Sequence, residues 1–276
     1  MSDAAACMTD TLPPDLFRAV AEARPRLDCF GSHVVFVPST GSTNDVALTL
    51  AATGDHEGAV IVADEQTAGR GRRGHVWFSP AQSGLYVSVV TSPARARTAP
   101  TRALSLVTLA AGVALTEGIE ACTGLRPTLK WPNDLFLGPR KVAGILAEAA
   151  GQRPVGEVVV VGYGINVRST AYPPELSDRA TSLEAELGRP VERDQIFVET
   201  LAALARRYRD LLDGRYDAIL DAWRDRAPSA AGRPVAWQTA AGARSGVTAG
   251  IDGDGALLVQ SDGRTERIIA GELTWM

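Results

Sequence analysis

The sequence predicts an α/β (α+β) fold, in which a mixed sheet covered by helices is followed by a small β-barrel. The first part alternates strand-like apolar runs such as "AVIVADE" and "GLYVSVVTS" with segments of helical periodicity. After a break at "RAPSAAGRP" the segments are short and alternating, and "DGDG" and "SDG" between them suit tight hairpin turns. We expect an N-terminal extension over residues 1–30, a larger domain over 31–226 and a small β domain over 227–276.

Local signals define the elements of the first half. The N-terminal extension predicts a loose tail and a short helix over residues 14–23, and "HVVFVPS" predicts a strand. "STNDVALTLAATG" predicts a helix, because Ser42 or Thr43 can supply the N-cap oxygen and Asp45 stands in the first turn. The two apolar runs quoted above then predict strands, with a glycine-rich loop between them.

The remaining elements follow in the same way. Residues 101–121 carry apolar side chains at helical spacing and predict a buried helix. "TLKWPND" predicts a strand that runs into a Pro-Asn-Asp turn, since the residue before proline favours extended backbone. "KVAGILAEAA" and "GEVVVVGYGINV" predict two strands of one sheet, and residues 180–226 predict helix. The strands of the barrel are predicted in "VAWQ", "GARSGVTAGID", "ALLVQS" and "RTERIIAGELTWM".

Composition excludes several classes of protein. The net charge of -4 and the pI near 5.5 argue against a nucleic-acid-binding face, so we expect no nucleic-acid partner. No apolar run approaches the roughly 18 residues that cross a bilayer, and the N-terminus lacks the features of a signal peptide. A cytoplasmic protein without a membrane partner is therefore expected. The three cysteines are widely spaced and form no C-x-x-C pair, so disulfides and zinc are not indicated, and no metal ligands are assigned.

A glycine-rich loop, "DEQTAGRGRRGHVWFS", contains the G-x-G-x-x-G spacing of dinucleotide-binding folds at Gly69, Gly71 and Gly74. Such a fold also needs a helix directly after the loop and an acidic residue about 20 positions later. Here the loop continues into "HVWFSP", which is a poor helix start, and no Asp or Glu occurs from Leu85 to Thr116. The loop therefore serves another ligand.

Lysine and asparagine are rare in this arginine-rich and alanine-rich chain. Of the 28 basic residues two are lysines, and there are three asparagines. Such a composition is typical of a GC-rich genome, which replaces these residues wherever Arg, Asp or Ser will serve. Lysine offers a compact ammonium, and asparagine offers an uncharged donor and acceptor. The few lysines and asparagines that remain therefore indicate sites where those properties are needed. They are Lys130, Lys141, Asn44, Asn133 and Asn166.

Five short motifs carry a family resemblance. "STN", "QTAGRGRRG", "KWPND", "KVAGIL" and "GYGIN" occur in this order before the small β domain, and over residues 32–276 the chain resembles the biotin protein ligases. The resemblance implies a mixed-sheet catalytic domain of the biotin/lipoate ligase type followed by an SH3-like β-barrel. It also implies ATP, biotin and Mg²⁺ as substrates and cofactor, and a biotin carboxyl carrier domain of acyl-CoA carboxylases as partner. About 40 residues precede "STN", fewer than a helix-turn-helix domain needs, so we expect the short form without DNA binding.

The reaction that the resemblance implies has two steps: biotin and ATP form biotinyl-5'-AMP, and a carrier lysine then takes the biotinyl group. Positive charge suits this chemistry, because the biotin carboxylate and the phosphates repel one another. Arg70, Arg72 and Lys130 are the expected catalytic residues. The residues expected to bind biotin are Ser42, Thr43, Asn44, Gln66, Arg70, Gly71, Arg72 and Lys130. Those expected to bind ATP and the adenylate are Trp77, Asn133, Asp134, Lys141 and Asn166.

The sequence leaves alternative roles open for several residues and for the protein as a whole. Ser42 and Thr43 could act as helix caps, Trp77 as a core aromatic, and Asp134 as a turn residue, a magnesium ligand or an orienting group for the amine. The role of His75, which stands where a basic residue is common in the family, is undecided. A lipoate protein ligase and an RNA-binding module that uses the Arg/Gly loop are the alternative functions. The sequence does not distinguish a monomer from a homodimer.

Overall fold

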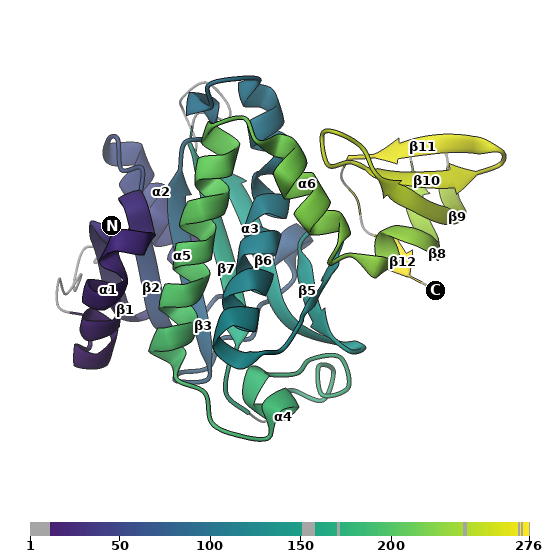
Figure 1. Cartoon of the computed structure of the whole chain (residues 1–276). Helices are drawn as coiled ribbons and strands as arrows, with labels where there is room; N and C mark the ends of the chain where they lie inside the picture. The colour runs from purple at the N-terminus through teal and green to yellow at the C-terminus, as the bar shows by residue number, and fades with distance from the viewer. Residues whose placement is uncertain are drawn as a thin grey trace, which may run out of the picture.

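The computed structural model describes residues 12–150, 158–169, 172–239, 242–269, 271 and 273–275, and its main feature is a seven-stranded mixed sheet (Figure 1). β1 and β2 are parallel, and every other neighbouring pair in this sheet is antiparallel. Across the sheet the strands are β1 (His33–Thr40), β2 (Ala59–Gln66), β3 (Gly84–Thr91), β7 (Val159–Asn166), β6 (Arg140–Ala149), β5 (Asp134–Leu137) and β4 (Thr128–Lys130).

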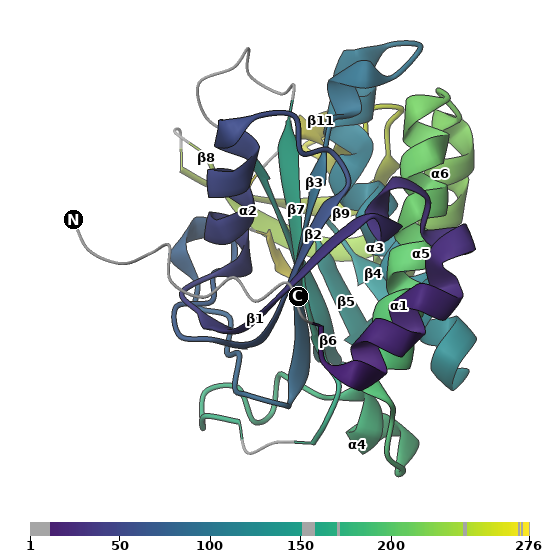
Figure 2. The ribbon, with the colours of Figure 1, turned by 90° about the vertical axis from the view of Figure 1, so that its left-hand side faces the viewer.

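Helices cover both faces of this sheet (Figure 2). α2 (Thr43–Thr53) packs on one face, where Ala47 and Ala51 join a small core with Ile61 and Val160. The larger core lies on the other face, beneath α3 and α5. Burial on both sides explains the continuous apolar runs of β2 and β3. The helices of the second face are α1 (Pro14–Leu27), α3 (Pro100–Thr123), α5 (Arg193–Leu212) and α6 (Tyr216–Arg224).

The long helix α3 corrects one expectation from the sequence. Its 24 residues are long and apolar enough for a bilayer span, although we expected no such run. Within its most apolar window 72% of the residues are buried inside the protein, against the sheet, α5 and α6. Its composition is therefore that of a core helix.

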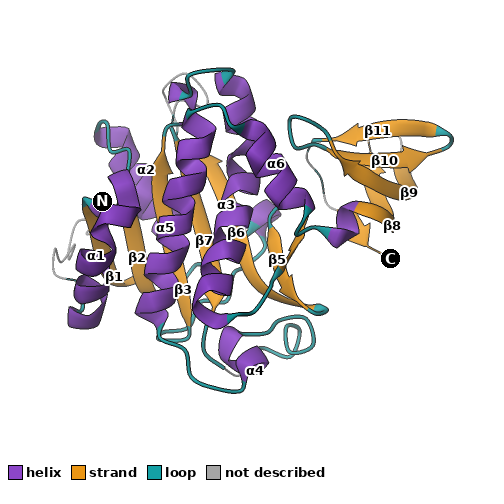
Figure 3. Ribbon diagram, in the orientation of Figure 1, coloured by secondary structure: helices purple, strands orange, loops and turns teal. Residues whose placement is uncertain are grey.

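A second, smaller sheet follows α6 (Figure 3). It is antiparallel, and β10 and β11 form a hairpin in which Asp262 and Gly263 both have positive φ, as a two-residue loop of type I′ requires. The mixed sheet and this small β unit confirm the predicted α/β (α+β) class. The strands, in spatial order, are β11 (Arg264–Ile268), β10 (Leu257–Ser261), β9 (Gly242–Ile251), β8 (Ala231–Thr239) and β12 (Leu273–Trp275).

Three details differ from the sequence prediction. The helical region 180–226 is divided into α4 (Leu183–Leu187), α5 and α6, because Gly188 and Gly214 adopt positive φ between them. The Pro-Asn-Asp turn leads directly into β5, a strand that the sequence did not predict. Residues 1–11 of the expected N-terminal extension lie outside the described residues, and the helix expected over 14–23 extends to Leu27.

Candidate active site

One cavity of about 570 Å³ lies where the start of α2, the glycine loop after β2, β4 to β7 and β12 meet. Its volume is within the usual range for small-molecule sites, about 300 to 1,000 Å³. All the residues predicted for the site line this cavity. They are Ser42, Thr43, Asn44, Gln66, Arg70, Gly71, Arg72, Trp77, Lys130, Asn133, Asp134, Lys141 and Asn166.

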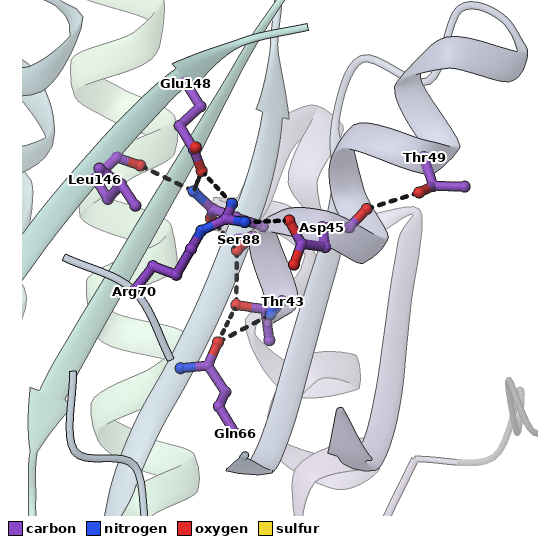
Figure 4. A network of polar contacts seen from close by, with 9 residues as sticks. Thr43, Asp45, Thr49, Gln66, Arg70, Ser88, Leu146 and Glu148 are labelled. Atoms are coloured by element: carbon purple, nitrogen blue, oxygen red, sulfur yellow. Dashed lines mark hydrogen bonds and ion pairs between the residues drawn. The ribbon is translucent and has the colours of Figure 1, made fainter. Parts of the chain in front are cut away.

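Hydrogen bonds fix the end of the cavity formed by α2 (Figure 4). Gln66 Oε1 accepts from Thr43 N at 2.9 Å and from Thr43 Oγ1 at 3.1 Å. Ser88 Oγ, fully buried, lies 2.7 Å from Thr43 Oγ1 and 2.6 Å from Asn44 Oδ1. Gln66 Nε2 donates to Ser79 Oγ at 3.0 Å. The polar groups at this end are therefore held in place by the protein itself.

This network corrects the capping prediction. Ser42 occupies the N-cap position of α2, but its hydroxyl makes no capping hydrogen bond. The acceptor for the first helical N–H, that of Thr43, is instead the side chain of Gln66. Ser42, which is 3% exposed, thus lines the cavity without acting as a side-chain cap.

Arg70 is held by two carboxylates at the same end of the cavity (Figure 4). Its Nη1 donates to Asp45 Oδ1 at 2.6 Å and its Nη2 to Glu148 Oε2 at 2.9 Å. Glu148 Oε2 also accepts from Asn44 Nδ2 at 2.6 Å. The charge of Arg70 is therefore balanced, and the contacts tie the glycine loop to both α2 and β6.

Glycines on β6 and β7 let side chains approach the sheet closely. A Cβ at Gly162 would overlap the amide of Asn44, and one at Gly164 would overlap the indole of Trp77. Gly144 is paired with Gly164 on the neighbouring strand, and a Cβ at Gly144 would lie 3.2 Å from the Trp77 ring. The glycines of "GYGIN" therefore have a packing function. Trp77 Nε1 is buried and has no partner among the described residues.

Lys130 and Arg72 differ from Arg70, because neither forms an ion pair with a carboxylate among the described residues. Lys130 Nζ lies 5.0 Å from the centre of the Phe136 ring and 5.1 Å from that of Trp275. Arg72 Nη1 has a long contact of 3.4 Å with Asn133 Oδ1. Burial lowers the pKa of both groups, and the neighbouring Arg73 lowers that of Arg72 further. Partly desolvated cations of this kind favour an anionic ligand.

The other residues predicted to bind the adenylate form contacts with neighbouring side chains and backbone carbonyls. Lys141 Nζ lies 2.6 Å from Asp134 Oδ1 and 5.3 Å from the centre of the Trp77 ring. Asn133 Nδ2 donates to Ile145 O at 2.7 Å, which anchors the turn after β4 to β6. Asn166 Nδ2 donates to Thr181 O at 3.0 Å. His75 lines the cavity, and its carbonyl accepts from Gly71 N within the loop.

Both lysines and all three asparagines of the chain line this one cavity. Their rarity in an arginine-rich sequence predicted that they belong to functional sites. Sequence reasoning did not identify Glu148, Ser88, Phe136 or Trp275. Glu148 carries a weak signal, since it is an acidic residue in the apolar strand "KVAGILAEAA". Trp275 carries none, because its approach to Lys130 depends on how the second sheet packs.

Comparison with known proteins agrees with this arrangement. The biotin/lipoate A/B protein ligase family matches residues 36–166. A biotin–(acetyl-CoA-carboxylase) ligase of Mycobacterium tuberculosis is 35% identical over 253 residues, which cover 86% of this chain and 86% of that protein. One of Paracoccus denitrificans is 34% identical, over 85% of this chain and 97% of that protein. The biotin protein ligase of Aquifex aeolicus, solved with biotin and ATP, has a TM-score of 0.76 and 26% identity, over 89% of this chain and 99% of that one.

The chain belongs to the biotin/lipoate A/B protein ligase family. Within that family it groups with the biotin protein ligases, whose sequences and structures it matches over most of its length.

Proposed function

We propose that this ligase attaches biotin to protein lysines in the cavity described above, through a biotinyl-5'-AMP intermediate. One observation carries the proposal: the cavity combines a rigid hydrogen-bonding end at α2 with two cations, Lys130 and Arg72, that form no ion pair with a carboxylate among the described residues. A neutral polar ligand head fits the first part, and the joined carboxylate and phosphate of an acyl adenylate fit the second. The relatives named above are biotin ligases, and one was solved with biotin and ATP.

In the first step a biotin carboxylate oxygen bonds to the α-phosphorus of ATP, and the bond to the β-phosphate breaks to release pyrophosphate. Both reactants are negatively charged, so the main contribution of the protein is to position them and to offset their repulsion. Lys130 and Arg72 supply that charge. Because both are already partly desolvated, their attraction for the forming mixed anhydride is stronger than it would be in water.

We assign the biotin end to Ser42, Thr43 and the start of the glycine loop at Arg70 and Gly71. Gln66 and Asn44 support this end, since their amides already bond to Thr43, Ser79, Ser88 and Glu148. Trp77 and Asn166 are assigned to the adenine. Asn133, Asp134 and Lys141, which also line the cavity, are assigned to the nucleotide, and Lys141 and Asp134 are paired.

Magnesium enters this proposal with the nucleotide. Among the described residues no group of three His, Cys, Asp or Glu could hold a metal ion. Asp134 lies in the cavity and offers a single carboxylate that is already paired with Lys141. This donor set fits an ion held mainly by ATP phosphates and water, which is how magnesium usually binds. Bound there, it would neutralise phosphate charge.

In the second step the amine of a carrier lysine attacks the acyl carbon, the bond to the AMP oxygen breaks, and the nitrogen loses a proton. We propose a biotin carboxyl carrier domain of an acyl-CoA carboxylase as the acceptor, in line with the names of the relatives. A cytoplasmic location, the absence of nucleic-acid binding, and a monomeric or homodimeric state remain predictions.

The test measures pyrophosphate release from ATP with biotin, with lipoate and with neither, followed by transfer of labelled biotin to a purified carrier domain. With ATP present, we expect pyrophosphate release and transfer to the carrier with biotin, and neither with lipoate. Equal turnover of lipoate would favour the alternative acyl ligase, and RNA binding without any response to biotin would contradict both.

A further inference from the structure

Lys130 contacts aromatic rings from two different sheets. Phe136 lies on β5, next to β4, and its ring centre is 5.0 Å from Lys130 Nζ. Trp275 lies on β12 of the small sheet, and its ring centre is 5.1 Å from the same nitrogen. Both distances are within the range of a cation–π contact, about 6 Å. The small sheet therefore contributes a side chain directly to the environment of Lys130.

The strand that carries Lys130 is also held by the C-terminal part of the chain on either side of it. Leu129 N donates to Arg226 O at 2.7 Å. Trp131 Nε1, buried, donates at 2.9 Å to the carbonyl of Gly255 in the β9–β10 turn. Three consecutive residues thus contact the segment that begins at the end of α6.

We propose that Trp275 is a positioning residue for Lys130, which holds the ammonium at the phosphate site by a cation–π contact. The proposal rests on the proposed function, because it assigns Lys130 to the reacting phosphate. A lysine side chain has about 2 kcal/mol of rotamer entropy, and a carboxylate that fixed it would also neutralise it. Aromatic faces restrict the side chain and leave its full charge available to an anion.

The rarity of lysine allows a direct test. In the full chain labelled with ¹³C-lysine, NMR should show two lysine side chains, Lys130 and Lys141, assigned by the loss of one signal in Lys130→Arg or Lys141→Arg. Lys141 lies 5.3 Å from the ring of Trp77 and serves as an internal control. Trp275→Leu removes one ring from Lys130 and should shift its Cε and Hε signals but leave those of Lys141 in place. Trp77→Leu should shift the signals of Lys141 and leave those of Lys130 in place.

Kinetics provide the second part of the test. Trp275→Leu should lower kcat for pyrophosphate release about tenfold, equivalent to about 1.4 kcal/mol, without raising KM for biotin. Trp275→Phe should restore most of the rate. Ile269→Ala, at an exposed apolar residue directly after β11, should leave the rate unchanged.

An unchanged Lys130 signal in Trp275→Leu would overturn the proposal, and so would equal rates for the Leu and Phe variants. If the wild-type protein releases no pyrophosphate with biotin, the proposed function fails, whereas the NMR comparison still decides whether Trp275 holds Lys130.

Discussion

At the scale of single residues, the shape of the cation at position 130 should matter as much as its charge. The ammonium lies about 5 Å from the centres of two rings, and a guanidinium is wider and planar, so it cannot take the same position. We expect Lys130→Arg to fold normally and to release pyrophosphate at least about a hundredfold more slowly, the usual effect of losing one well-placed group at a developing charge.

Lys141→Arg is the matched control for that variant. Lys141 pairs with Asp134, and an arginine can keep this ion pair, so the loss should stay below about tenfold. Circular dichroism of both variants establishes folding. Near-normal pyrophosphate release from folded Lys130→Arg would remove Lys130 from the reacting centre.

Arg70 and Arg72 should have different effects because their surroundings differ. Arg70 is balanced by Asp45 and Glu148, whereas Arg72 has a long contact with Asn133. A charge-assisted hydrogen bond from Arg72 to the intermediate would contribute about 1.5 to 3 kcal/mol, or roughly a ten- to hundredfold slower escape. Arg72→Gly should therefore form biotinyl-AMP and release it, which would biotinylate bystander proteins.

Arg70→Gly should instead raise KM for biotin and slow adenylate formation, because the loss of the ion pairs with Asp45 and Glu148 leaves the beginning of the loop unrestrained. Chromatography of released biotinyl-AMP and labelling of excess albumin measure the difference. The assignment is wrong if Arg72→Gly retains the intermediate as long as the wild type does.

At the scale of elements, the glycine loop is fixed at its beginning by contacts that can be weakened one at a time. Ala68 N donates to Gly41 O at 2.9 Å, and Arg70 contacts Asp45 and Glu148. Trypsin cleaves after arginine, and the loop contains three. Glu148→Gln removes one partly exposed ion pair, worth up to about 1 kcal/mol, so cleavage without ligand should rise about two- to fivefold.

Glu65→Gln is the control for that experiment, since Glu65 accepts a hydrogen bond from Ser39 and its charge lies at the end of β2, before the glycines of the loop. Biotin with ATP should slow cleavage in every variant, because ligand contacts offset the entropy of the ordered loop. Equal cleavage of wild type and Glu148→Gln would show that Glu148 does not restrain the loop.

Elements with strong local patterns could be predicted from the sequence, and contacts between elements could not. β2 and β3 are buried on both faces and appear as apolar runs, and the site motifs stand at the ends of such elements. β5 has four residues, too few for a periodic signal. The contact of Glu148 with Arg70 depends on how α2, β6 and the loop come together, and that of Trp275 with Lys130 depends on the packing of two sheets.

At the scale of the whole molecule, the turn between β9 and β10 joins the small sheet to α3 and to the end of β4. Gly255 in this turn has a φ of +82° and accepts the hydrogen bond from Trp131. Arg102 Nε on α3 donates to Gly253 O at 2.7 Å. The same turn therefore joins the core helix α3, the strand of Lys130 and the small sheet.

Two glycines of the small sheet offer a matched pair of variants. A Cβ at Gly255 would lie 2.7 Å from Leu109 Cδ1 and 3.0 Å from Leu106 Cδ2, whereas at Gly263, with a φ of +73°, nothing lies within 4 Å. Backbone strain should destabilise both alanine variants by about 1 to 2 kcal/mol. Only in Gly255→Ala does the added methyl also crowd α3, which should destabilise that variant by about 1 to 3 kcal/mol more.

Gly255→Ala should therefore lower the melting temperature further than Gly263→Ala, by about 2 to 4 °C for each additional kcal/mol in a protein of this size. Because the displaced turn also carries the partner of Trp131, beside Lys130, it should slow pyrophosphate release, and Gly263→Ala should not. Calorimetry and the pyrophosphate assay on the two proteins check this. Equal losses of stability and activity would mean that the turn does not couple the small sheet to the active site.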